Sequence, residues 1–481
     1  MQSKILAESR QNLAIAIQSG RKHRLNFKSW ILTMAKNLSR RDVLRGAALS
    51  AAGLAAGPLV ASASTGGSTS PSPKPIPTAI RSRPAVGVIA TGGKGWSGME
   101  WAAQYGDIVA LCDVDLNERV RALQAYPKAS SFLDYREMID KIGKDLDAVI
   151  ISTPDHHHYT ASALAMNAGI HCYCEKPLCR SVWEVRQLSM LANKKRLMTQ
   201  MGNQSTASTP MRKIAAHIKK GTFGAVKEVH LWTDRAARYW KQGISRPTTV
   251  PIPRQLDYDL WLGPRPYRPY GEGYHPFSWR GWWDFGTGAL GDMGCHIFNS
   301  VHMALNLDNP ISVQAQTSGH NRDSFPTWAI VEYEFGAKRE RPGFKLKWYD
   351  GGKQPPLSLV PTAQNYNGNG VIIVCEGGTI YCPNEANAEF HWVGGHTIPD
   401  IEIEESPGHM AEFFRAIEGG PEPVSNFPRY AGPLTETVLM GNLAIWADGP
   451  KVEWDARRMK VKGTNEYDSL IRPEFRDGWD V

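Results

Sequence analysis

The stretch AVGVIATGGKGWSG (Ala85–Gly98) decides the fold of this chain. It begins as an apolar, strand-like run and continues into a glycine-rich loop ahead of a helix-like segment. Laid on the spacing G-x-G-x-x-G, the loop has Ala90 at the first position, followed by Gly92 and Gly95. Such a loop lets the backbone approach a pyrophosphate group, which then rests on the helix N-terminus. The stretch therefore predicts a dinucleotide-binding domain.

Four further apolar runs alternate with helix-like segments after this loop. Continuous apolar strands between helices predict a parallel sheet that is covered on both faces. The ligand of such a sheet binds beyond the carboxyl ends of its strands. The four runs are Asp107–Val114, Leu146–Thr153, Ile170–Lys176 and Leu197–Asn203.

Asp113 ends the second of the predicted strands. An acid at this place hydrogen-bonds the ribose hydroxyls and repels a 2′-phosphate, so we expect NAD rather than NADP. Lys94 in the loop keeps NADP possible, because an ammonium group attracts that phosphate.

Three consecutive histidines follow another predicted strand, in STPDHHHYTASAL (Ser152–Leu164). They suggest a metal site, but adjacent positions on a helix point in different directions. We therefore expect His158 to face the cofactor and the other two to be solvated. Three cysteines at positions 172, 174 and 179 likewise fit no common zinc spacing, so no metal is expected.

Lys176, in HCYCEKPLCRS (His171–Ser181), stands at the end of a predicted buried strand. An ammonium group is costly there unless something uses it. A structural alternative is an ion pair with Glu175, since such pairs are common at strand ends.

A second polar group appears far away, in GTGALGDMGCHIFNSVHMAL (Gly286–Leu305), which we expect to form one amphipathic helix. Asp292 and His296 are four residues apart and share a helix face. A carboxylate beside an imidazole holds its orientation and raises its pKa. Histidine is the usual general base for a hydroxyl proton near neutral pH. The alternative is an Asp–His pair on a helix surface with no chemical role.

Taken in order along the chain, these motifs resemble the Gfo/Idh/MocA family of nicotinamide-dependent sugar and polyol oxidoreductases, which includes glucose–fructose oxidoreductase and inositol dehydrogenase. The resemblance extends from about Ala85 to the C-terminus and includes LDYDLWLGP (Leu256–Pro264) and SNFPRYAGPLTETVLMGNLA (Ser425–Ala444). The chain departs from the family's common loop at Ala90, which we expect to loosen the pyrophosphate geometry slightly.

The resemblance implies that Lys176 and His296 are catalytic and that Asp292 assists them. His296 would take the hydroxyl proton while hydride leaves the same carbon, and Lys176 would stabilise the developing alkoxide or relay the proton. Cofactor contacts are expected from Gly92, Gly93, Lys94, Gly95, Asp113, Thr153, Pro154, His158, Glu175, Lys176, Asn203 and Trp283. Substrate contacts are expected from Arg235, Arg238, Tyr274, His275 and Arg280.

The expected fold class is α/β, with a Rossmann dinucleotide-binding domain over 84–204. It is followed over 205–481 by an α+β domain with a large, open, mainly antiparallel sheet and C-terminal helices. Turn-separated strand-like runs predict that sheet: Ala225–Thr233, Trp328–Phe335, Gly343–Asp350 and Gly370–Cys382. The family often associates through this sheet, so we expect a homodimer or homotetramer.

The N-terminal region 1–63 reads as a leader that contains an export signal. SRRDVLRGAALSAAGLAAGPLVASA (Ser39–Ala63) has paired arginines, an uncharged stretch of small and apolar residues and an A-x-A ending. It resembles a twin-arginine signal cleaved near Ala63, with either Met1 or Met34 as the start. The alternative is a basic, disordered N-terminus. A linker rich in Ser, Pro and Gly is expected over 64–83.

The charge distribution supports this division. The net charge of +8 is contained in 1–63, and the remainder has equal numbers of basic and acidic residues, which removes the main support for nucleic-acid binding. We expect passage through the twin-arginine export machinery to the periplasm, without a membrane anchor. The seven scattered cysteines do not form a disulfide framework and agree with folding in a reducing compartment before export.

Export also bears on the expected function. Free nicotinamide cofactors are scarce outside the cytoplasm, so we expect a sugar or polyol oxidoreductase whose NAD(P) is tightly held and recycled in place. One alternative is an NAD-dependent glycosidase that oxidises, eliminates and reduces within one turnover. Lys176 favours the dehydrogenase, because some relatives of the glycosidase type lack it. A second alternative is a non-catalytic sugar-binding protein, which would need no general base.

Overall fold

The structure, a computed structural model, describes residues 83–236, 238–384 and 389–481. The expected leader over 1–63, its signal and nearly all of the expected linker over 64–83 lie outside these residues. Among the helices that are described, none is both long and apolar enough to cross a membrane.

The first sheet is parallel throughout and has six strands in the order β3-β2-β1-β4-β5-β6. Its central strands β1 and β4 are buried along their whole length, as continuous apolar runs require. Its strands are β1 (Ala85–Ile89), β2 (Asp107–Cys112), β3 (Ser130–Phe132), β4 (Ala148–Ile151), β5 (His171–Cys174) and β6 (Thr199–Met201). This is the predicted Rossmann arrangement, and it is confirmed.

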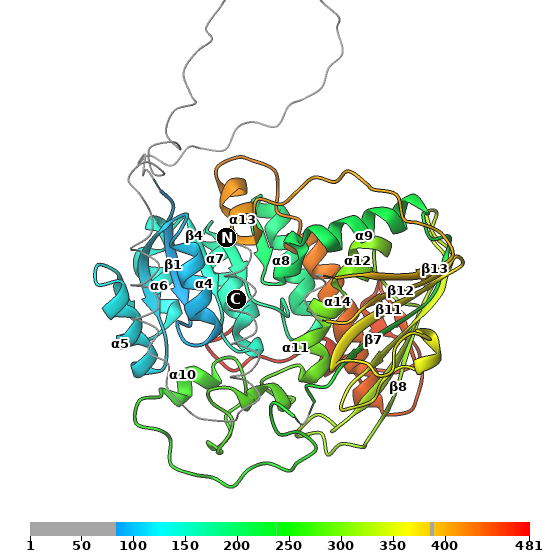
Figure 1. Cartoon of the computed structure of the whole chain (residues 1–481). Helices are drawn as coiled ribbons and strands as arrows, with labels where there is room; N and C mark the ends of the chain where they lie inside the picture. The colour runs from blue at the N-terminus through cyan, green and yellow to red at the C-terminus, as the bar shows by residue number, and fades with distance from the viewer. Residues whose placement is uncertain (1–82, 237, 385–388) are drawn as a thin grey trace, which may run out of the picture. The chain divides into compact units, whose positions relative to one another are not determined.

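Helices connect these strands and cover the sheet (Figure 1). They are α4 (Lys94–Ala102), α5 (Leu116–Ala125), α6 (Tyr135–Ile142), α7 (His158–Asn167) and α8 (Val182–Lys195). α8 begins with a capping box, in which Ser181 accepts a hydrogen bond from the Glu184 N–H and the Glu184 carboxylate accepts one from the Ser181 N–H. The capping box fixes the first residue of α8 and therefore the point at which the turn that contains Lys176 ends.

The second sheet has nine strands in the order β13-β12-β11-β7-β10-β9-β8-β14-β15. Only the β7–β10 pair is parallel, so the sheet is mainly antiparallel, as predicted. Its strands are β7 (Val226–Thr233), β8 (Ser312–Thr317), β9 (Ala329–Phe335), β10 (Phe344–Tyr349), β11 (Asn369–Cys375), β12 (Gly378–Cys382), β13 (His391–Gly394), β14 (Val452–Asp455) and β15 (Lys460–Val461).

The layer between the two sheets is helical (Figure 1). Its main member is α14 (Gly432–Ala447), which is buried over most of its length and packs on α8, α11, β8 and β9. A helix that is largely apolar on all sides has to be buried. The other helices of this part are α9 (Thr209–Lys220), α10 (Tyr258–Leu262), α11 (Gly288–Ile297), α12 (Asn299–Leu305), α13 (His409–Ile417) and α15 (Asp468–Ile471).

The helices α13 and α14, both predicted from the sequence, take different places. α13 packs back on the first sheet, because Phe413 and Phe414 belong to the same buried cluster as Val86 and Val88 of β1. α14 instead joins the layer between the sheets. The C-terminal part of the chain thus helps to fix the two sheets against each other.

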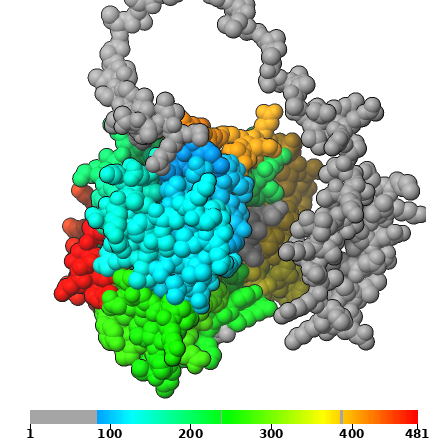
Figure 2. All heavy atoms as spheres, turned by 90° about the vertical axis from the view of Figure 1, so that its left-hand side faces the viewer, coloured from blue at the N-terminus to red at the C-terminus, as the bar shows by residue number. Residues whose placement is uncertain are grey.

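A long connection between β7 and α11 returns to the first sheet, and we call its residues 249–285 the crossing segment. Its backbone pairs with the turn after β2: the Leu116 N–H donates to the Gln255 carbonyl at 2.9 Å, and the Asp257 N–H donates to the Val114 carbonyl at 3.0 Å. In Figure 2 this green part of the chain abuts the cyan residues of the first sheet's domain. The crossing segment therefore roofs the carboxyl ends of the first sheet.

Two sequence predictions of single elements are wrong. Gly286–Leu305 forms two helices, α11 and α12, with Phe298 between them. Gly370–Cys382 contains a tight antiparallel hairpin, β11 and β12, because the chain reverses at Glu376-Gly377. In both cases the apolar pattern continues across a turn, so the pattern alone does not show where one element ends and the next begins.

Candidate active site

The largest cavity described lies beyond the carboxyl ends of the first sheet and measures about 820 Å³. It is lined by the glycine loop, the ends of β2, β4 and β5, the crossing segment, the end of β7 and helix α11. Most residues with expected chemical roles meet there.

The glycine loop opens on this cavity at the start of α4. The helix has Gly93 as its N-cap and no side chain that caps it, and the Gly95 N–H donates to the Gly92 carbonyl at 2.9 Å, so the helix N-terminus presents its positive end to the cavity without a capping side chain. Gly92, Gly93 and Lys94 line the cavity. Gly95 does not line it; a Cβ there would lie 2.0 Å from the Ala90 carbonyl oxygen, so Gly95 allows the tight turn itself.

Ala90 adopts a left-handed backbone with φ of 66°. The loop thus keeps a conformation that glycine adopts freely, although it has a methyl group at this position. Alanine has a steric cost of about 1–2 kcal/mol in this region, so the expectation of a slightly looser pyrophosphate geometry stays a prediction.

The side of the cavity next to β2 is acidic. Asp113 accepts hydrogen bonds from the Thr91 N–H at 2.7 Å and the Asp115 N–H at 2.9 Å, which fix its carboxylate at the rim. Burial raises the pKa of Asp113, and these hydrogen bonds oppose the rise. Asp115 and Glu118 line the same side. Their negative charge disfavours a 2′-phosphate.

The hydroxyls of Ser152 and Thr153, at the end of β4, are buried and have no hydrogen-bond partner among the described residues. Both residues line the cavity, as does Pro154. Orphaned hydroxyls at a strand end, an uncapped helix N-terminus and an acidic rim together fit a bound NAD.

At the other side of the cavity, Lys176 and Asp292 form an ion pair. The Lys176 Nζ donates to the Asp292 carboxylate at 2.9 Å and to the Asp292 carbonyl at 2.7 Å. The alternative that Lys176 forms an ion pair with Glu175 is wrong, because the Glu175 carboxylate forms its ion pair with Lys94, at 3.7 Å. Two bonds leave the third N–H of the ammonium group available to a ligand.

Two arginines also converge on Asp292. The Arg280 Nε donates to the carboxylate at 3.0 Å, and an Arg235 nitrogen lies 3.7 Å from it. Burial alone would raise the pKa of Asp292, but Lys176, Arg280 and Arg235 outweigh it and hold the pKa well below its usual range. Asp292 Oδ2 accepts no hydrogen bond from any described residue.

His296 lies one turn after Asp292 on α11 and faces the cavity. Burial, followed by the charge of Lys176, lowers its pKa to about 3, although Asp292 acts in the opposite direction. The predicted effect of the carboxylate is present, since Asp292 raises the pKa of His296, but burial and Lys176 outweigh it. The imidazole is neutral at physiological pH, which is the form that accepts a proton.

Asp155 is a buried acid that sequence analysis did not select. Thr287 donates a hydrogen bond to its carboxylate at 2.5 Å. Burial raises its pKa to about 7, against the lowering effects of Thr287, Arg280 and Lys176. Its position directly after Pro154, at a strand end, is a signal that could have identified it.

The three histidines are buried and none is solvated. His156 and His157 each place a ring nitrogen 2.8 Å from the Trp261 carbonyl, so they anchor the crossing segment. The His158 ring lies between the carbonyls of Pro177 and Thr153, at 2.7 and 2.9 Å, and does not line the cavity. His156 and His157 therefore connect the segment after β4 to the crossing segment, and His158 connects it to the turn after β5.

Other expected contacts lie outside the cavity for clear reasons. Asn203 is buried, where its side chain bonds to Asn299 and Ser425. The Trp283 ring stacks on Phe325. Tyr274 is buried among aromatic rings of the crossing segment, and the exposed Arg238 pairs with Asp234. The expected contacts Thr153, Pro154, Glu175, Lys176, Arg235, His275 and Arg280 do line the cavity.

Several further residues line the cavity and were not predicted from the sequence. Trp261, Phe277 and Trp279 come from the crossing segment, whose return to the first sheet has no local sequence signal. Tyr135 and Gln204 line the cavity from the Rossmann side.

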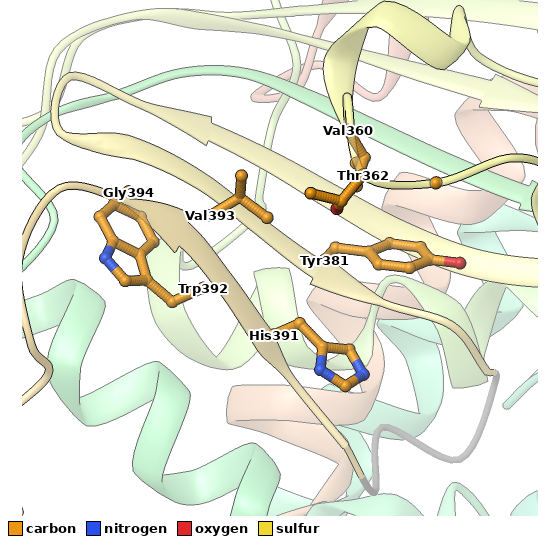
Figure 3. Close-up of a pocket in the computed structure, with 8 residues that line it drawn as sticks. Val360, Thr362, Tyr381, His391, Trp392, Val393 and Gly394 are labelled. Carbon is orange, nitrogen blue, oxygen red and sulfur yellow. The ribbon is translucent and has the colours of Figure 1, made fainter.

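A second pocket, of about 490 Å³, lies between β12, β13 and the loop before β11 (Figure 3). Its lining is mostly apolar, and none of its residues also lines the larger cavity. His391 there lies 2.8 Å from exposed Glu389. Lys176, Asp292 and His296 are all in the larger cavity, which is the candidate active site.

Comparisons with known proteins agree with this geometry. A family model described as the oxidoreductase family, NAD-binding Rossmann fold, matches residues 86–203. A second, described as the oxidoreductase family, C-terminal alpha/beta domain, matches residues 207–339. Together they account for more than half of the chain.

Two curated proteins show partial similarity. A UDP-N-acetylglucosamine 3-dehydrogenase of Acidithiobacillus ferrooxidans is 28% identical over 177 residues, which are 36% of this chain and 49% of that protein. A glycosyl hydrolase family 109 protein of Shewanella is 27% identical over 205 residues, 39% of this chain and 44% of that protein. The chain thus matches less than half the length of each.

The crystal structure of the WlbA dehydrogenase from Bordetella pertussis, in complex with NADH and UDP-GlcNAcA, has the same fold. Its TM-score is 0.54 at 18% identity, covering 78% of this chain and 99% of that one. The order of the two sheets, the glycine loop and the two matching family models lead to one conclusion. The chain belongs to the Gfo/Idh/MocA oxidoreductase family and has an NAD-binding Rossmann domain.

Proposed function

We propose that this protein oxidises a hydroxyl-bearing carbon of a sugar or polyol with a tightly held NAD. The observation that carries the proposal is a single cavity that contains both the glycine loop and the set Lys176, Asp292 and His296. The relatives named above, a sugar-nucleotide dehydrogenase among them, support a carbohydrate substrate.

NAD supplies the hydride acceptor when it is bound. The residues of the chain accept the proton of the substrate hydroxyl and stabilise the negative charge that develops on its oxygen. The neutral His296 accepts the proton of the substrate hydroxyl, as its lowered pKa allows. The free N–H of the Lys176 ammonium group donates to the hydroxyl oxygen and stabilises the negative charge that develops there.

Asp292 positions these groups. Its Oδ1 holds the Lys176 ammonium group at 2.9 Å, while its unpartnered, buried Oδ2 is available to a second substrate hydroxyl. The crossing segment covers one side of the cavity, and the low exposure of Asp292, 6%, strengthens its interactions with the surrounding charges.

The crossing segment also supports a slowly exchanging cofactor. Its backbone bonds to Val114 and Leu116 lie just after Asp113, where the ribose of NAD is expected, and His156 and His157 hold the segment at Trp261. Release of NAD therefore requires these contacts to open. A retained cofactor must be reoxidised in place, by a second substrate or within one cycle.

We further propose that the protein folds around NAD and is then exported by the twin-arginine-type signal over 39–63. All seven cysteines are buried and none is assigned to a disulfide, which is compatible with folding in a reducing compartment. The large second sheet is the proposed surface for a homodimer or homotetramer.

His296→Ala tests the proposal, with His391→Ala in the pocket of Figure 3 as a matched control. The measurement is single-turnover reduction of bound NAD across a panel of sugars. We expect the control to react like the unchanged protein, and His296→Ala to be slower by about 10²–10⁴-fold. An unchanged rate in His296→Ala would favour a different base or a binding protein.

A further inference from the structure

The segment 474–481 bridges two parts of the chain that line the active-site cavity, and we call it the strap. On one side it holds the crossing segment. The Arg476 N–H donates to the Pro264 carbonyl at 3.0 Å. The Arg476 guanidinium group donates to both oxygens of the Asp259 carboxylate, at 2.7 and 3.3 Å, and to the Asp259 carbonyl at 3.0 Å. A bidentate pair of this kind fixes position as well as charge, so the strap is attached firmly to α10.

On its other side the strap contacts the Rossmann domain. Trp479 is only 4% exposed, and its ring packs against the rings of Tyr135 and His157, with centroids 5.9 and 5.7 Å away. The Arg136 guanidinium group lies over the Trp479 ring at 3.9 Å and donates to the Gly478 carbonyl at 3.0 Å. The strap therefore joins α10 to the start of α6 and to the segment after β4.

The strap does not itself line the cavity, whereas the residues that it holds do. Tyr135 and His157 line the cavity directly. On α10, Leu260 and Trp261 line it next to Asp259, the residue that Arg476 binds. Detachment of the strap would therefore reach the cavity through these side chains.

A chain of hydrogen bonds connects the two walls of the cavity beside the strap. The Tyr135 hydroxyl lies 3.0 Å from Nδ1 of His157, and Nε2 of His157 lies 2.8 Å from the Trp261 carbonyl. Burial lowers the pKa of His157 to about 4, so the ring is neutral and can accept from the hydroxyl while it donates to the carbonyl. Gly263, with φ of 53°, permits the contact, because a Cβ there would lie 2.0 Å from the His157 ring.

These residues lie at the adenosine end of the cofactor. Lys176 and His296 mark the place of the nicotinamide, the N-terminus of α4 that of the pyrophosphate, and Asp113 that of the ribose. The adenine is then expected further along, beyond Asp113. α10 begins directly after Asp257, whose N–H donates to the carbonyl of Val114, the residue that follows Asp113. The helix that the strap holds is therefore next to the ribose end.

We propose that the strap holds α10 against the Rossmann domain over the adenosine half of NAD, so that NAD leaves only after the strap detaches. Arg476 and Trp479 are positioning residues, which act on the cofactor through α10, Tyr135 and His157. This inference rests on the retained NAD of the proposed function and names the residues that control its release.

The dissociation rate of NADH tests the proposal. The full chain is loaded with NADH, and the loss of its bound fluorescence is followed after an excess of NAD is added. We expect Trp479→Ala, and removal of residues 474–481, to speed release by roughly 30-fold or more, as the loss of a buried tryptophan anchor implies. The affinity for ADP-ribose, measured by calorimetry, should fall by a similar factor, because this ligand has the adenosine half without the nicotinamide.

Three variants separate positioning from general stability. Trp454→Ala is the matched control: Trp454 is also 4% exposed, but it lies on β14 of the second sheet and does not line the cavity. It should lower the temperature of thermal unfolding without faster NADH release. Trp479→Phe should restore most of the slow release, because it keeps a ring against Tyr135 and His157. Should the strap variants misfold, Arg476→Gln leaves the Trp479 contacts in place and should speed release by about 3- to 10-fold.

The outcomes separate the inference from the proposed function. Unchanged NADH release from folded strap variants overturns the inference and leaves the proposed function standing. Release that is equally fast in Trp454→Ala also overturns it, because the effect would then reflect general stability. Strap-dependent release of NADH, with no reduction of bound NAD by any sugar, supports the inference and contradicts the proposed function.

Discussion

Replacement of Lys176 by methionine removes the ammonium group at the centre of the site while it keeps most of the side-chain volume. Two hydrogen bonds to Asp292, at 2.7 and 2.9 Å, are lost. The Asp292 carboxylate still has Arg280 at 3.0 Å and Arg235 at 3.7 Å. Its charge therefore remains compensated, and the protein should stay folded.

The magnitudes follow from these contacts. A buried carboxylate that loses its sole partner costs about 3–5 kcal/mol, so with two cations retained we expect a loss of only about 1–3 kcal/mol in the free energy of unfolding. The rate of hydride transfer should fall further, by about 10²–10⁴-fold, because the ammonium group assigned to the developing alkoxide is lost. In barrier height, this is roughly 3–5 kcal/mol.

The assay is single-turnover reduction of bound NAD, with thermal unfolding measured on the same samples. Lys213→Met is the matched control, because Lys213 pairs with exposed Asp400 at 2.8 Å and does not line the cavity. A folded Lys176→Met protein that transfers hydride at nearly the unchanged rate would refute the role assigned to Lys176.

Three further predictions follow from the cavity. Above pH about 7 the ionised Asp155 adds negative charge near Lys176 and Arg280, which opposes the negative charge developing on the substrate oxygen, so the rate of hydride transfer should fall as pH rises through 7; Asp155→Asn should flatten this step, and a step that persists would assign it to another group. Gly95→Ala should abolish NAD retention, measured by absorbance after desalting, because its Cβ would lie 2.0 Å from the Ala90 carbonyl oxygen; retention of NAD would refute the tight turn. Asp113→Asn should raise the affinity for NADP relative to NAD by about tenfold, since a repulsive charge is lost, and an unchanged ratio measured by calorimetry would contradict that role.

The sequence predicts those site residues whose chemical role depends on a local pattern. The glycine loop, Asp113 and Lys176 each follow a predicted strand, and the carboxyl ends of parallel strands meet at one edge of a sheet. Their convergence could therefore be expected before the structure was seen. Asp292 and His296 could be paired because one helical turn separates them.

Other features depend on long-range packing and had no such signal. The crossing segment returns over the first sheet through backbone bonds to Val114 and Leu116, which any sequence can form. The histidines were expected to be solvated because they are polar, but the Trp261 carbonyl satisfies two of them inside the protein. Asp292 raises the pKa of His296 as the spacing predicts, but burial and Lys176, which the local spacing does not reveal, outweigh it.

The most direct test of the account is the absorbance of bound nicotinamide in the purified, desalted protein as sugars and glycosides are added one at a time. We predict that one of them produces reduced nicotinamide that accumulates and persists until a second substrate is supplied. Cofactor that stays oxidised while a glycoside is consumed would contradict the dehydrogenase account and show that the redox cycle closes within one turnover.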